Sequence, residues 1–116
     1  MIPKDKWKWY GAPAHFCCAP WCCFHLATEV GKYVVSTVGE YFPPHATERD
    51  RPEKPTNIGC DRLYETMVFK KDKGRCKCGC GAPMIKLTEL DFLPYNGRKE
   101  ANKGHMDLCK KWSLKQ

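Results

Sequence analysis

The side chains best suited to chemistry are cysteines and histidines, and the richest stretch lies between residues 76 and 109. It opens with three thiols at alternate positions beside glycines, and His105 and Cys109 follow at i, i+4. A pair with this spacing lies on one face of a helix. Thiolates on a tight turn and such a helical pair can together surround zinc as a tetrahedron. We therefore predict a zinc site made by Cys78, Cys80, His105 and Cys109, with Cys76 as the alternative thiol.

Four protein ligands would leave no open position for water, so this predicted zinc would be structural. Leu108 and Trp112 share a helical stripe with His105 and Cys109 and would shield the metal. The alternative is that the thiols pack as small hydrophobic groups while His105 stays exposed.

A second cluster between residues 15 and 25 contains four cysteines and two histidines. Its nearly palindromic spacing predicts another zinc site, formed by His15, Cys18, Cys22 and His25. Pro20 would leave the first two on a turn and place the last two on the first turn of a helix. Two alternatives stay open: thiols packed without metal, and a metal- or thiol-dependent enzyme centred here.

Motifs typical of catalysis are missing from the sequence. It has no Walker-type loop, no G-x-G-x-x-G and no H-E-x-x-H, and no carboxylate that would orient a Cys–His pair is identifiable. These absences favour a protein that is not an enzyme.

The cysteine count and the charged start of the sequence indicate the compartment. Nine cysteines, an odd number, cannot form a complete set of intramolecular disulfides. The first residues lack the apolar region of a signal peptide, and no stretch has the apolar length that spans a membrane. We expect a cytoplasmic protein with metal-bound thiolates and no membrane partner; a secreted disulfide scaffold is the alternative.

The net charge of +7 is confined to one half of the sequence. Residues 70–116 hold twelve Lys and Arg against five Asp and Glu, whereas residues 1–69 hold eight of each. Such a basic field attracts phosphate backbones or acidic protein surfaces. The predicted nucleic-acid-binding residues are Lys70, Lys71, Lys73, Arg75, Lys77, Arg98, Lys99, Lys103, Lys110 and Lys111.

The predicted architecture is one α+β domain over residues 1–116: a small zinc-stabilised unit with a short antiparallel sheet and a C-terminal helix. Residues 32–41 and 62–70 are rich in β-branched and aromatic residues and predict strands, joined by a proline-rich exposed loop over 43–57. Residues 76–112 would be the metal-anchored segment. Within it, 84–95 is expected to be irregular, and a helix is expected from about Asn102, its N-cap, to Trp112.

Two smaller features concern the first residues and one carboxylate. Alternation over residues 6–9 favours a short half-buried strand, although interleaved Lys and Trp can also stack on bases and neutralise phosphates. Glu65 interrupts the apolar face of its strand, which favours a position at a wet edge of the sheet.

Several runs also resemble small uncharacterised proteins encoded in bacteriophage and prophage genomes. They are Trp9-Tyr10-Gly11 with His15-Phe16, Phe24-His25-Leu26-Ala27-Thr28, Ser36-Thr37-Val38-Gly39-Glu40-Tyr41 and Gly104-His105-x3-Cys109-x2-Trp112. The resemblance implies a setting in a host cytoplasm and no particular activity. The residues that match ligands in that pattern are His15, Cys18, Cys22, His25, Cys80, His105 and Cys109, and the extra thiols Cys17, Cys23 and Cys76 leave the ligand choice open.

Three functions follow as hypotheses. The first is a phage-type module with one or two zinc ions that binds nucleic acid through its basic C-terminal half. The second is a protein-binding inhibitor of a host factor, such as a defence complex or a polymerase. The third is the enzyme centred on residues 15–25.

Overall fold

The computed structural model describes residues 1–116 except 11–20, 43–46, 51, 59–60 and 77–79. A 3-10 turn, η1 (Lys4–Lys6), precedes five strands: β1 (Lys8–Tyr10), β2 (Cys22–Val30), β3 (Tyr33–Tyr41), β4 (Tyr64–Arg75) and β5 (Pro83–Tyr95). A second 3-10 turn, η3 (Glu48–Asp50), lies between β3 and β4, and the helix α1 (Arg98–Ser113) follows β5. The predicted α+β architecture with an antiparallel sheet and a C-terminal helix is confirmed.

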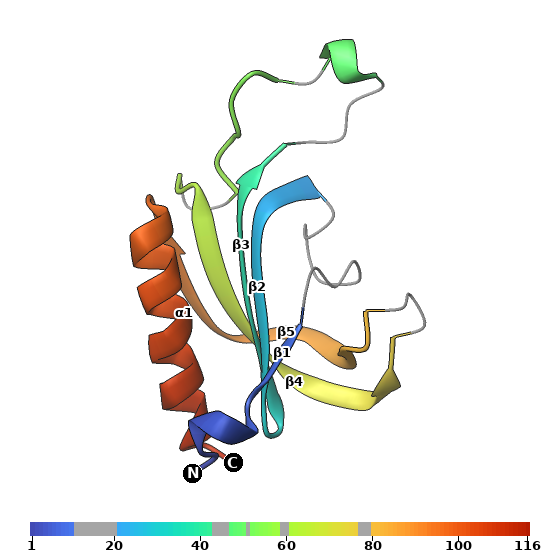
Figure 1. Ribbon diagram of the computed structural model, residues 1–116, viewed down its shortest axis with the longest axis vertical. Helices are drawn as coiled ribbons and strands as arrows, with labels where there is room; N and C mark the ends of the chain where they lie inside the picture. Colours follow the sequence, from blue (N-terminus) through green and yellow to red (C-terminus); the bar gives the residue numbers. More distant parts are fainter. Residues whose placement is uncertain (11–20, 43–46, 51, 59–60, 77–79) are drawn as a thin grey trace.

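The five strands form one antiparallel sheet in the order β1-β2-β3-β4-β5, so each strand pairs with its neighbour in sequence. Helix α1 covers one face of this sheet (Figure 1). Because side chains alternate along a strand, each strand sends half of its residues toward α1 and half toward the far face. Val35 belongs to the core beneath the helix, whereas its neighbour Val34 belongs to the core on the far face.

The long hairpin of β4 and β5 bends away from the rest of the sheet (Figure 1). Its register shifts three times, between Val68 and Phe69, between Phe69 and Lys71, and between Lys71 and Arg75. Irregularities of this kind bend a strand and increase its twist. The hairpin thereby returns to the far face, where Gly81 approaches the ring of Tyr10.

The strands predicted over 32–41 and 62–70 correspond to β3 and β4, and the one predicted over 6–9 overlaps β1 only at residues 8 and 9. Two further predictions were wrong. Cys22 and His25 lie in strand β2, not on the first turn of a helix, and the irregular segment predicted over 84–95 is strand β5. The helix begins at Arg98, one turn before the predicted N-cap: Gly97 is its N-cap, and Asn102 lies inside it, donating to the Arg98 carbonyl at 2.9 Å.

The predicted loop over 43–57 contains η3, and Thr56 pairs with Tyr41 in a single bridge. Residues 52–54 are exposed, as predicted.

Close approaches fix α1 on the sheet. Gly104 faces Tyr95, and a Cβ atom at Gly104 would lie only 1.9 Å from the Tyr95 hydroxyl oxygen. At the start of the helix, Arg98 pairs with Glu40, which also accepts a hydrogen bond from the Tyr64 hydroxyl at 2.6 Å. Glycine is therefore required where the helix crosses β5, and one carboxylate joins β3, β4 and α1.

Candidate functional site

His105 lies fully buried between α1 and the sheet, and threonine hydroxyls flank both of its ring nitrogens. Thr37 Oγ1 is 2.6 Å from Nδ1, and Thr28 Oγ1 is 2.8 Å from Nε2. Thr37 also bonds to Thr66 at 2.6 Å, so the hydroxyls of three neighbouring strands are connected. Burial, together with the charge of His25, lowers the pKa of His105 to about 3. The imidazole is therefore neutral near pH 7 and anchors the helix to the sheet.

Cys109 lies one turn further along α1 and is also fully buried, in the core with Leu108 and Val35. Burial raises the pKa of its thiol to about 12, against a small opposing effect of a hydrogen bond with Thr28. The Cys109 thiol is therefore protonated near pH 7. The predicted helical stripe is confirmed, because His105, Leu108 and Cys109 all face the sheet.

Cys80, by contrast, packs against the core on the far face of the sheet, with Ala82 and Ile85 among its members. The structure therefore does not bring Cys80 together with His105 and Cys109, because the sheet lies between them. Cys76 lies at the end of the same hairpin, its backbone N–H donating to the Ala82 carbonyl at 3.0 Å. The remaining predicted ligand of this site, Cys78, falls outside the described residues.

The predicted N-terminal site is described only in part, because His15 and Cys18 fall outside the described residues. Cys22 packs against the far-face core, and His25 Nε2 lies 3.3 Å from Ser36 Oγ. Burial lowers the pKa of His25 to about 4. Among the described residues, no three or more His, Cys, Asp or Glu side chains form a group that could hold a metal ion. Zinc at either cluster stays a prediction.

The Glu65 carboxyl group is buried, although the sequence pattern predicted a solvent-exposed position. It is 5% exposed and lies in β4, paired with Val38 on one side and Pro94 on the other. The expected wet edge is therefore wrong: β4 is an interior strand. Burial, reinforced by the negative charge of Glu89, raises the pKa of Glu65 to about 7.

Ion pairs neutralise half of the ten cations that were predicted to bind nucleic acid. Glu29 holds Lys71 and Arg75, Glu40 holds Arg98, Asp107 holds Lys103 and Asp91 holds Lys111. Burial would raise the pKa of Glu29, but hydrogen bonds from Arg75, Lys71 and Tyr10 outweigh it and lower that pKa to about 2. These cations are therefore compensated locally. Of the other predicted cations, Lys70, Lys73, Lys99 and Lys110 are exposed, and Lys77 falls outside the described residues.

A different set of lysines gathers where both ends of the chain meet. The Ile2 N–H donates to the Ser113 carbonyl at 3.0 Å, and the Lys32 N–H donates to the Gln116 side chain at 2.7 Å. The N-terminal segment, the β2–β3 turn and the end of α1 therefore lie together, as the positions of N and C show (Figure 1). We call the following exposed residues the basic end: Lys4, Lys6, Lys8, Lys32, Lys70, Lys110 and Lys115.

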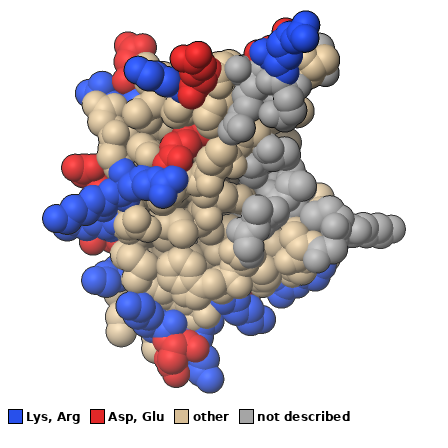
Figure 2. Space-filling view, turned by 45° about the horizontal axis from the view of Figure 1, so that its top comes forward, with Lys and Arg blue, Asp and Glu red and all other residues tan. Residues whose placement is uncertain are grey.

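Within the described ranges, no lysine of the basic end forms an ion pair with a carboxylate, since all the salt bridges there involve other cations. Asp5 is an acidic neighbour, in the same turn as Lys4 and Lys6. Figure 2 shows Lys and Arg side chains along the lower margin of the molecule, with an acidic group among them. The positive charge of the basic end is thus shared between residues 4–8, Lys32 and the C-terminal half.

The tryptophans of the N-terminal segment divide between core and surface. Trp7 is 8% exposed and packs in the core beneath α1, just before β1 begins. The half-buried strand predicted over residues 6–9 is wrong in its burial, because Lys8 and Trp9 of β1 are both exposed. Trp9 is 49% exposed, and its ring centroid lies 5.5 Å from that of His105. One tryptophan therefore belongs to the core, while the other offers an aromatic surface beside Lys8.

No protein-family model, curated protein or solved structure matches this chain. Within the described part of the chain, none of the helices is both long enough and apolar enough to span a membrane. The resemblance to phage-encoded proteins stays a prediction.

Proposed function

We propose that this protein binds nucleic acid, with the basic end contacting the phosphate backbone. The observation that carries the proposal is the difference between two classes of lysine. The lysines of the basic end are exposed and form no ion pair with any carboxylate that the structure describes, whereas Lys71, Lys103 and Lys111 are each held by one. A cation already compensated by a carboxylate contributes little to an external field, so of these two classes the first is the one available to phosphates.

The convergence of several elements at the basic end suits a polyanion. Its lysines come from η1, β1, the β2–β3 turn, β4 and the end of α1, and these elements converge. Charges within about 8 Å of one another reinforce each other at physiological salt. A phosphate chain laid across this end would meet several ammonium groups in succession and release condensed counterions.

Binding of this kind is weakly specific. Lysine ammonium groups act as compact point charges that recognise phosphate rather than the edges of bases. A half-exposed tryptophan next to Lys8 adds a stacking surface that accepts any base. The structural zinc predicted at the cysteine clusters remains part of the proposal as scaffold, since such a site stabilises the fold.

The test compares two double variants with the same change in net charge. Lys6→Ser/Lys32→Ser removes two residues of the basic end, and Lys103→Ser/Lys111→Ser removes two paired lysines. We expect the first to weaken binding of a labelled oligonucleotide by about tenfold or more at low salt, and the second by less than about threefold. Equal losses, or no binding by the wild-type protein, would overturn the proposal.

An acidic protein surface is the other partner that a basic end could attract. Binding to a purified acidic protein is therefore measured beside binding to DNA and RNA. If the protein forms a stable complex with the acidic protein and none with DNA or RNA at low salt, an acidic protein takes the place of nucleic acid as the proposed partner.

A further inference from the structure

A preformed pocket of about 360 Å³ opens at the basic end, between the N-terminal segment and the last turn of α1. Its lining is apolar apart from two lysines and a serine: Met1, Ile2, Pro3, Lys4, Trp7, Lys110, Ser113 and Leu114. Cavities of this size and lining are typical of sites for small organic groups. No local sequence pattern predicts this pocket, because its walls come from opposite ends of the chain.

Hydrogen bonds hold the walls of the pocket in place. The Trp7 indole Nε1–H donates to the Ile2 carbonyl at 3.2 Å, and the Ile2 N–H donates to the Ser113 carbonyl at 3.0 Å. The Ser113 hydroxyl in turn donates to the Lys110 carbonyl at 2.6 Å. An occupant would therefore meet a wall that is already ordered, which lowers the entropic cost of binding.

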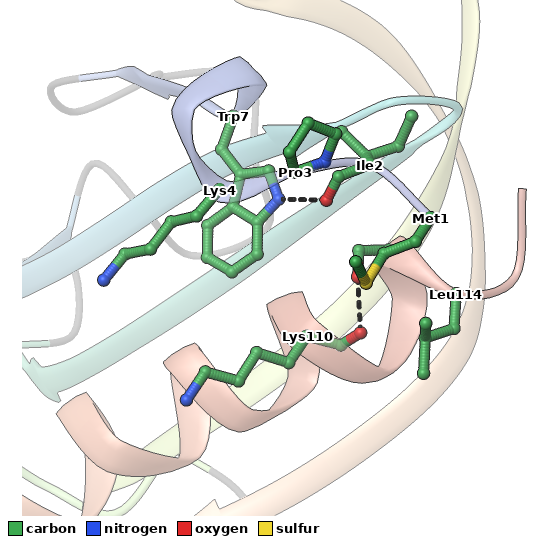
Figure 3. Close-up of a pocket in the computed structure, with 8 residues that line it drawn as sticks. Met1, Ile2, Pro3, Lys4, Trp7, Lys110 and Leu114 are labelled. Atoms are coloured by element: carbon green, nitrogen blue, oxygen red, sulfur yellow. Dashed lines mark hydrogen bonds between the residues drawn. The ribbon is translucent and has the colours of Figure 1, made fainter.

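One side of the pocket is positively charged and the other is apolar. Figure 3 shows the Trp7 ring between the two lysine side chains, with the ammonium groups of Lys4 and Lys110 extending to the same side. Met1 and Leu114 lie on the other side, and both are largely exposed. The occupant that fits has a flat or apolar body for the wall and an anionic group for the two ammonium groups.

We propose that this pocket takes one unstacked base of a single-stranded nucleic acid, while Lys4 and Lys110 contact the phosphates that flank it. The proposal rests on the proposed function and deepens it, because it selects single strands over duplexes. Trp7, which is 8% exposed, adds a small aromatic part to a wall otherwise made by Met1, Ile2, Pro3 and Leu114. Aromatic surface next to cations is how proteins bind single strands without sequence preference. A base in a duplex is stacked and paired, and taking it out requires breaking both interactions.

Charge complementarity favours a nucleotide over an uncharged occupant, because the pocket lies within the basic end. Trp9 follows Trp7 at i+2 along the same edge of the sheet, so its half-exposed ring can receive a neighbouring base. The mouth of the pocket is open, so the polar edges of a bound base stay in water and any base is accepted.

The test compares three probes of equal length: a single-stranded oligonucleotide, the same strand with abasic sugars in place of nucleotides, and the duplex. Affinity is measured by anisotropy, and pocket entry by the resonance of the Trp7 indole N–H. We expect the single strand to bind about tenfold more tightly than either of the others and to shift the Trp7 resonance. The abasic strand should bind through charge alone and leave that resonance unmoved.

A matched pair of variants separates the pocket from the fold. Leu114→Gln makes one wall of the pocket polar without changing charge, and Leu87→Gln makes the same change at an exposed leucine of β5 outside the pocket. We expect Leu114→Gln to lose about threefold or more of the affinity for the single strand and none for the abasic strand. Leu87→Gln should change neither.

Failure of this inference and failure of the proposed function give different results. Equal, salt-dependent affinity for all three probes would overturn the pocket assignment and leave binding by the basic end intact. No binding to any probe would overturn both. A Trp7 shift with phosphatidylserine vesicles, and none with the single strand, would overturn the pocket assignment in favour of a lipid.

Discussion

Thr37 and His105 are 68 residues apart in sequence, yet Oγ1 of the threonine lies 2.6 Å from Nδ1 of the histidine. This contact joins the central strand β3 to helix α1 at a fully buried position. His105 was predicted to be a zinc ligand, and here its two nitrogens face hydroxyl groups instead. Because Thr37 and His105 contact each other, a substitution of Thr37 measures what this contact contributes to stability.

Replacing Thr37 by valine keeps the shape of the side chain but removes the hydroxyl that His105 faces. We expect the free energy of unfolding to fall by about 1–3 kcal/mol, because a buried ring nitrogen loses its partner. Urea unfolding measures this, with Thr88→Val on the exposed face of β5 as the control. A Thr37→Val protein as stable as wild type would show that the ring nitrogen has another partner, such as a metal ion.

The structure separates two of the predicted zinc ligands, with Cys80 on the far face of the sheet and Cys109 beneath α1. Because the sheet separates Cys80 from Cys109, an ion bound through Cys80 cannot also be held by Cys109 in this fold. Elemental analysis should find one or two zinc ions per wild-type chain. We expect Cys80→Ala to lower the zinc content and Cys109→Ala to leave it unchanged. Loss of the same single ion in both variants would contradict the fold, and a metal-free wild type would contradict the zinc prediction.

The raised pKa of Glu65 predicts that the contribution of this residue to stability depends on pH. The folded protein keeps the proton of Glu65 up to about pH 7, whereas the unfolded chain releases it near its usual pKa of 4.5. The contribution of Glu65 to the free energy of unfolding therefore falls as the pH rises from about 4.5 to 7 and levels off above, by up to about 3 kcal/mol. The buried neutral histidines His25 and His105 act in the opposite direction below about pH 6.5, so the Glu65 contribution is read from the difference between variant and wild type. Glu65→Gln should remove this loss, raising stability at pH 8 and leaving it nearly unchanged at pH 4.5.

Urea unfolding of the Glu65→Gln protein at these two pH values is the measurement. Glu53→Gln, at an exposed carboxylate outside the helix and the strands, is the matched control and should be neutral at both. If Glu65→Gln destabilises the protein at pH 8, the carboxylate has a stabilising partner and this account of Glu65 is wrong.

The close approach of Gly104 to Tyr95 predicts that Gly104→Ala destabilises the protein. In an exposed helix interior, replacing glycine by alanine stabilises by about 1 kcal/mol. At Gly104 the new Cβ atom would overlap the Tyr95 hydroxyl, so we expect destabilisation by about 1–3 kcal/mol instead. Thermal unfolding tests this against Asn102→Ala, an exposed position on the same helix. A more stable Gly104→Ala protein would show that α1 does not approach Tyr95 so closely.

Local patterns predicted those parts of the fold that depend on neighbouring residues. The β-branched run over residues 33–41 indicated β3, and the stripe of His105, Leu108 and Cys109 indicated the buried face of α1. The start of strand β2 was mistaken for a helix because Pro20, just before it, can begin one. Strand β5 was missed because its apolar residues do not keep a strict alternation.

The candidate site depends on contacts that no local pattern contains. The basic end combines residues 4–8 with residues 110 and 115, and only the converging ends of the chain bring them together. The ion pairs that compensate Arg98 and Lys111 likewise join distant segments, through Glu40 and Asp91. Net charge per half of the sequence was therefore a poor guide to where free positive charge lies.

The central claim, that the basic end binds a phosphate backbone, is tested most directly by a salt titration of the affinity for a single-stranded oligonucleotide. Each phosphate contact contributes about −0.7 to the slope of log K against log salt concentration. With four to seven of the lysines engaged, the account predicts a slope of about −3 to −5 for the wild-type protein. For Lys6→Ser/Lys32→Ser the slope should be shallower by about 1.4. A slope near zero, or no binding at about 50 mM salt, would contradict the claim.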